Sequence, residues 1–208
     1  MKKQQSGFTL VEVAIVMVII GLLLGGVLKG QEVITNARLK NVNNDFSGIS
    51  AAIYSYQDRY AALPGDDIAA DAHTGAATNG DGDGLFDVAF VPAAAGDESS
   101  LVWSHLRSAG LIAGDATSVI PPTNAFGGIT GISTGDLTGA VNDTNGITGI
   151  HVGFSQIEGN MAVILDTQND DGNGNTGTVR ANANIAAAAP LAAGQYNLTN
   201  IYSLIFEL

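Results

Sequence analysis

The N-terminal part of the chain consists of two stretches with different hydrophobic patterns. From Phe8 to Leu28 only one side chain is ionisable, Glu12, and the others are apolar, small or neutral. A helix over this stretch would be about 31 Å long, close to the thickness of the hydrocarbon core of a bilayer. The pattern therefore predicts a membrane-spanning helix. An ionised, unpaired carboxylate inside such a helix costs free energy in the membrane. We therefore expect Glu12 to pair with a group of opposite charge.

The second stretch, after Lys29, is amphipathic. Its apolar residues recur at spacings of three and four, which is typical of one face of a helix: Leu39, Val42, Phe46, Ile49, Ile53, Tyr56, Tyr60 and Leu63. We expect this face to pack on a globular domain. Pro64 and Gly65 should end the helix, because proline cannot continue it. The two stretches together predict one helix from about Phe8 to Ala62, about 80 Å long.

The remaining residues predict a mixture of short elements. Residues 64–96 are loop-like, and Asp97 to Ile112 have the pattern of a short helix in which Trp103 and His105 are packing or surface residues. We expect strands at about His151–Gln156 and Met161–Leu165, and another within Tyr196–Leu208.

Charge is distributed unevenly along the chain and narrows the range of partners. The net charge is −12, and from Asn41 onward there are 18 acidic residues but only three basic ones, Arg59, Arg107 and Arg180. An acidic body of this kind argues against direct binding to nucleic acid and suits divalent cations. The chain has no cysteine, so no disulfide can hold its loops.

One loop has the ligand spacing of a calcium-binding loop. Oxygen-bearing groups fall at alternate positions, with glycines between them: Asn79, Asp81, Asp83, the carbonyl of Leu85, and Asp87. Phe90 stands where an EF-hand has its glutamate, and no flanking helix pattern is close. We therefore expect a structural calcium site that is not an EF-hand, completed by Asp66, Asp67, Asp97 or Glu98. A solvated turn is the alternative interpretation.

A second oxygen-rich loop runs from Asp166 to Asn175. Its spacing is less regular, and Asp170, Asp171 and Asn173 are the candidate calcium ligands. A hairpin turn between Leu165 and Val179 explains the same residues nearly as well.

Three interpretations compete for the N-terminus: a secretory signal, a plain single-pass anchor, and a prepilin leader. A secretory signal would have an uninterrupted apolar core, and a plain anchor leaves Glu12 unexplained. Lys2 and Lys3, then Gly7, then Phe8-Thr-Leu-Val-Glu12 and the apolar run resemble the leader and first helix of type IV pilins and of type II secretion pseudopilins. The two lysines also place the bulk of the chain outside the cytoplasm.

The resemblance implies a fold, a processing pathway and a set of partners. The fold is the α+β type IV pilin fold, in which a long N-terminal helix packs on a C-terminal antiparallel β-sheet domain with long loops. Prepilin peptidase would cleave after Gly7 and methylate the amine of Phe8, and Glu12 would pair with that amine in a neighbouring subunit. The implied divisions are a leader (1–7), a filament-core or membrane half of the helix (8–30), its amphipathic half (31–63) and a globular α+β head (64–208).

The function expected from the sequence is that of a structural subunit of a type IV pilus-like helical filament. The chain would begin as a single-pass inner-membrane precursor, be handled by membrane assembly machinery and end in an extracellular filament. A pseudopilin of a periplasmic pseudopilus is the first alternative, and a minor tip pilin or adhesin is the second. No cysteine nucleophile, G-x-S-x-G, phosphate loop or H-E-x-x-H occurs, so an enzyme is not expected.

Overall fold

The computed structural model describes residues 9–86, 94–134, 147, 149–182 and 195–208. The chain divides into two compact units, residues 1–40 and 41–208, and each is described by itself. Helix α1 (Leu10–Tyr60) contributes to both units. The remaining elements all lie in the second unit, so the α+β, pilin-like order of one long helix followed by an antiparallel sheet is as predicted.

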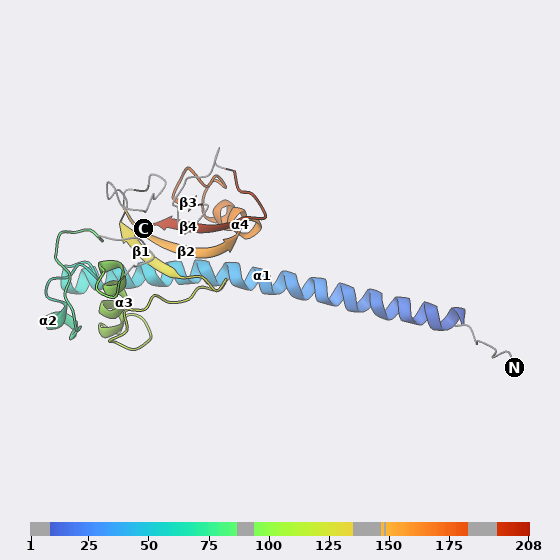
Figure 1. Cartoon of the computed structure of the whole chain (residues 1–208), viewed down its shortest axis with the longest axis horizontal. Coiled ribbons are helices and arrows are strands. Elements are labelled where there is room, and N and C mark those ends of the chain that lie inside the picture. Colours follow the sequence, from blue (N-terminus) through green and yellow to red (C-terminus); the bar gives the residue numbers. More distant parts are fainter. Residues whose placement is uncertain (1–8, 87–93, 135–146, 148, 183–194) are drawn as a thin grey trace. The chain divides into compact units, whose positions relative to one another are not determined.

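Four strands form one antiparallel sheet in the second unit. They are β1 (Thr130–Thr134), β2 (Ile150–Glu158), β3 (Val179–Asn182) and β4 (Ile201–Glu207), in the spatial order β1-β2-β4-β3 (Figure 1). The expected strands near His151–Gln156 and near the C-terminus correspond to β2 and β4. A bulge interrupts the pairing of β2 with β4 between Phe154 and Ile157.

The second unit has a core that the amphipathic stretch of the sequence helps to build. Val42, Ile49, Ile53 and Tyr56 of α1 are buried, as the three-and-four spacing predicted. The ring of Phe46 lies 5.1 Å from that of Phe206 in β4, and Phe206 in turn meets Phe154 of β2 edge to face. Burial of these apolar side chains is the main source of stability for this unit.

The second unit also contains three short helices: α2 (Ala70–Thr74), α3 (Glu98–Ser108) and α4 (Gly159–Asn169). Helix α3 was predicted, and Trp103 and His105 are fully buried in it. The expected strand at Met161–Leu165 is wrong, because these residues lie in α4. The β-branched pair Val163-Ile164 favours a strand locally, but the buried positions Ala162, Leu165 and Asp166 have helical spacing, and packing against the sheet outweighs local preference.

The end of α1 carries a strained residue. Ala61 has φ +52°, in the left-handed region where helices normally end on glycine. We expect Ala61→Gly to stabilise the protein by about 1 kcal/mol, because glycine adopts this conformation without a Cβ clash. Ala62→Gly is the matched control, since Ala62 is not among the residues with positive φ. Urea denaturation of the full chain in detergent measures the free energy of unfolding of both variants. Equal changes in this free energy for the two substitutions would contradict this explanation.

A buried histidine in the sheet should make the fold sensitive to acid. His151 of β2 is 1% exposed, and burial lowers the pKa of its imidazole from 6.5 to about 4. The unfolded chain therefore binds a proton below pH 6.5 that the folded chain accepts only near pH 4. Stability is complete above pH 6.5 and falls as the pH drops toward 4, by on the order of 3 kcal/mol.

This prediction is measured by urea denaturation of the full chain at pH 7 and at pH 4.5. His151→Asn is the comparison variant, because asparagine keeps a donor near the Gly149 carbonyl, which lies 3.3 Å from Nδ1, but does not titrate. The variant should lose less stability than the wild type between the two pH values. The same loss in both would rule out His151 as the titrating group.

Candidate functional site: an N-terminal carboxylate and two acidic clusters

The first candidate site is the N-terminal end of α1, and Glu12 has a local partner there. The Glu12 carboxylate accepts hydrogen bonds from the backbone N–H and the hydroxyl of Thr9, both at 2.8 Å. The Thr9 hydroxyl accepts one in return from the Glu12 N–H at 3.2 Å. This reciprocal pair is a capping box, which satisfies donors that a helix start leaves free. Its recognisable sequence pattern, Thr-x-x-Glu, was not among the predicted features.

The helix that follows has the composition of a membrane span. Within α1, an 18-residue window reaches a mean hydropathy of 2.7, and none of that window is buried within the chain. The helix is thus long and apolar enough to cross a bilayer. The predicted processing residues Gly7 and Phe8 lie outside the described residues.

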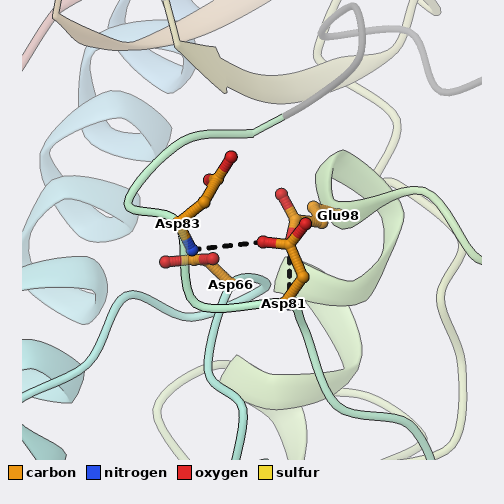
Figure 2. Close-up of side chains that lie close together, drawn as sticks. All are labelled: Asp66, Asp81, Asp83 and Glu98. Atoms are coloured by element: carbon orange, nitrogen blue, oxygen red, sulfur yellow. Dashed lines mark hydrogen bonds between the residues drawn. The ribbon is translucent and has the colours of Figure 1, made fainter.

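The second candidate site, the loop cluster, consists of Asp66, Asp81, Asp83 and Glu98. Each offers a carboxylate oxygen, and these oxygens all lie within 4.8 Å of one another. The carboxylates come from three segments, and Figure 2 shows them gathered between the glycine-rich loop and the start of α3. Asp66 and Glu98 are buried, whereas Asp81 and Asp83 are exposed. Such a set of oxygen ligands could hold a metal ion.

Glycine allows the loop to approach the segment that carries Asp66. A Cβ on Gly80 would lie 2.3 Å from the backbone of Gly65 and Asp66, which is too close for any other residue. Gly80 N–H also donates to the Asp67 carbonyl at 2.9 Å. Asp66 in turn accepts hydrogen bonds from the N–H groups of Gly82 at 2.7 Å and Gly84 at 3.0 Å. The loop is therefore wound around the Asp66 side chain.

Three of the other residues expected at this site form hydrogen bonds of their own. The side chain of Asn79 forms two hydrogen bonds with Asp71, at 2.8 and 3.0 Å. Asp67 is bonded to Tyr56 and His73, and Asp97 accepts a hydrogen bond from the Ala94 N–H. Asp87 lies outside the described residues. Of the four acids suggested to complete the shell, Asp66 and Glu98 are the two that join Asp81 and Asp83.

The charged form of Asp66 is disfavoured in the loop cluster, mainly by burial. Burial raises the pKa of its carboxyl, and the nearby charge of Asp83 acts in the same direction, against hydrogen bonds from the loop N–H groups. Among the described residues, Asp66 has no ion pair with a basic side chain. A bound divalent cation would offset the repulsion among the four carboxylates.

Through His105, helix α3 holds the segment 65–78, which carries Asp66. The imidazole Nδ1 accepts a hydrogen bond from the Gly65 N–H at 2.8 Å, and Nε2 lies 2.8 Å from the Thr78 carbonyl. Burial lowers the pKa of His105, which favours the neutral ring that can both accept and donate. His105 thus ties both ends of residues 65–78 to the helix that also supplies Glu98. No motif in the sequence indicated this contact.

A second acidic group, the α4 cluster, consists of Asp166, Asp170 and Asp171. Asp166 is fully buried, accepts a hydrogen bond from the Tyr196 hydroxyl at 2.6 Å, and has its pKa raised by burial. Asp170 accepts from the N–H groups of Thr178 and Val179, and Asp171 from the Thr176 hydroxyl. These three carboxylates could also hold a metal ion.

The predicted surroundings of the α4 cluster need one correction. The alternative of a hairpin turn between Leu165 and Val179 is wrong, because Leu165 belongs to helix α4 and not to a strand. The Asn173 side-chain oxygen, which stays a candidate ligand, accepts a hydrogen bond from the Asn175 N–H at 3.3 Å. Asp166, the first residue of the predicted loop, takes part in the cluster together with Asp170 and Asp171.

Comparison with known proteins identifies a family motif at the N-terminus. Residues 2–28 match the family described as the prokaryotic N-terminal methylation motif, and no curated protein matches the chain. The motif is the hallmark of type IV pilins and pseudopilins. It covers Gly7, Phe8 and Glu12, so the resemblance in the leader is confirmed. The motif and the long apolar helix fit a membrane-anchored precursor that is processed by prepilin peptidase.

Proposed function

We propose that this chain is a structural subunit of a type IV pilus-like helical filament. The N-terminal methylation motif at residues 2–28 is the observation that carries the proposal. It is supported by the apolar N-terminal part of α1, which lies in a unit separate from the sheet domain. Assembly is then the function, and the protein is structural rather than catalytic. The precursor is anchored in the inner membrane with its head outside the cytoplasm. The membrane assembly machinery then incorporates it into an extracellular filament.

Processing creates the contact that sets the register of the filament. Prepilin peptidase cleaves after Gly7 and methylates the new amine of Phe8. The carboxylate of Glu12 pairs with the Phe8 amine of a neighbouring subunit, which neutralises both charges in an apolar medium. Before assembly, the Thr9 hydrogen bonds lower the cost of holding Glu12 at the helix end.

Calcium is the proposed ligand of the loop cluster, with a structural role. Carboxylate oxygens are the ligands that calcium prefers, and the cluster joins the loop, the segment after α1 and the start of α3. In a head without disulfides, one ion would tie three segments together. The α4 cluster is a second and smaller candidate for the same ion.

A pseudopilin of a type II secretion system is the second candidate function. The acidic, cysteine-free head with its two acidic clusters favours it, because such a head suits a periplasmic piston that is rigidified by cations. The two functions share the same leader, helix and processing. They differ in where the filament ends and in what is lost when the gene is deleted.

Electron microscopy of material sheared from the cell surface tests the proposal. The expected result is long filaments that contain this chain and disappear on deletion of its gene. A surface without such filaments, together with loss of protein secretion in the deletion strain, would replace the pilus function with the pseudopilin function.

A further inference from the structure

A turn directly before β4 presents an asparagine side chain to solvent. Asn197, Leu198 and Thr199 are all exposed, and they form the pattern Asn-x-Thr with leucine in the middle. In exported proteins this pattern is the acceptor for N-linked glycans. The pattern alone is common by chance, so the geometry of the side chains has to decide whether it is meaningful.

The Asn197 amide is polarised by its threonine. The side-chain carbonyl oxygen of Asn197 accepts two hydrogen bonds, from the Thr199 N–H at 3.0 Å and from the Thr199 hydroxyl at 2.8 Å. Hydrogen bonds to an amide oxygen withdraw electron density from the amide and make its N–H groups more acidic. Within the described part of the chain, Nδ2 of Asn197 donates no hydrogen bond, so it is available to a reagent from outside.

The turn is held in this conformation by the rest of the head. The Asn197 N–H donates to the Tyr202 hydroxyl at 2.8 Å, and the Asn200 N–H donates to the Asn197 carbonyl at 3.1 Å. The Asn200 carbonyl accepts the N–H of Gly159, the first residue of α4, at 2.8 Å. The backbone is therefore fixed on its inner side, while the three side chains of the pattern remain outside.

We propose that Nδ2 of Asn197 is the acceptor for an N-linked glycan. The donor is a saccharide carried on a lipid diphosphate. The bond between Nδ2 and the sugar C1 forms, and the bond between C1 and the diphosphate oxygen breaks. The lipid diphosphate leaves with the bonding electron pair, and a base of the transferase takes the proton from Nδ2. This proposal depends on the proposed function in one respect only, which is that the head is exported from the cytoplasm.

Peptide mass spectrometry of the full chain, purified from the cells that naturally produce it, tests this proposal. The peptide that contains Asn197 should carry the mass of one or more sugars. The sugars should vanish in Asn197→Gln and in Thr199→Val, and should persist in Thr199→Ser, which keeps the hydroxyl. Asn142→Gln is the control, because Asn142-Asp-Thr144 is the other triplet of this kind and lies outside the described residues.

Two outcomes overturn the proposal. One is an Asn197 peptide without sugar, and the other is a sugar that persists in Thr199→Val. The N-terminal peptide from the same sample separates this failure from failure of the proposed function. A methylated Phe8 terminus beside a sugar-free Asn197 overturns only the glycan, whereas an unprocessed terminus contradicts the filament function whatever Asn197 carries.

Discussion

Subunits in which Glu12 is replaced by alanine should fail to enter filaments. In the proposed filament, the intersubunit pair between Glu12 and the Phe8 amine would form in an apolar medium. Removing one partner of a buried ion pair costs on the order of 3–5 kcal/mol, because the other charge is left uncompensated. That corresponds to a loss of more than about a hundred-fold in affinity of the subunit for the filament. Co-expression of tagged Glu12→Ala with wild-type subunits, followed by quantification of the tag in sheared filaments, measures the loss.

Two controls separate pairing from helix capping. Glu32→Ala removes a carboxylate that forms an exposed ion pair with Lys29 at 2.9 Å in the same helix, and incorporation should change little. Thr9→Val removes the capping hydroxyl but keeps Glu12, and loss of such a cap costs about 1 kcal/mol. Incorporation of Thr9→Val should therefore fall far less than that of Glu12→Ala. Equal losses in the two variants would assign Glu12 to capping and contradict the intersubunit pair.

Removal of calcium should lower the thermal stability of the head. At a free calcium concentration about one hundred times the dissociation constant, binding to the folded state alone contributes about 2.7 kcal/mol. For a domain of this size, chelation should then lower Tm by roughly 5–10 °C. Thermal unfolding of the full chain in detergent, with calcium and with a calcium chelator, measures this difference.

Substitutions show which cluster binds the ion. Asp83→Asn in the loop cluster should remove most of the calcium-dependent change in Tm, and Asp171→Asn in the α4 cluster should remove less. Asp58→Asn, an exposed residue of α1 in neither cluster, should leave the change intact. An unchanged Tm at every calcium concentration would mean that the clusters hold no calcium and that hydrogen bonds alone organise the loops.

The long helix could be predicted from the sequence because its signals are strong and local. One apolar run and one stripe of regular spacing specify it, and Pro64 limits where it ends. Helix α4 could not be predicted, because Met161 to Leu165 satisfy the local preferences of a strand. Contacts with the sheet, which join residues far apart in the chain, decide in favour of the helix. The capping box at Thr9 and Glu12 has a clear local pattern, so the sequence alone could have predicted it.

The loop cluster was partly predictable for a similar reason. Alternate oxygen side chains between glycines identified Asp81 and Asp83, because ligand spacing within one loop is a local property. Asp66 and Glu98 were two of four acids that could have completed the site. Their selection depends on the position of α3 and on the close approach permitted by Gly80, which only the fold determines. The contacts of His105 with Gly65 and Thr78 likewise join segments that the sequence does not relate.

In the function proposed above, this chain is processed at Gly7 and assembled through its new N-terminus. Mass spectrometry of the N-terminal peptide, from filaments sheared off the producing cells, tests it most directly. We expect a peptide that begins at Phe8 and carries a methyl group on its amine. A peptide that begins at Met1 or at any other residue, or filaments that do not contain this chain, would contradict it.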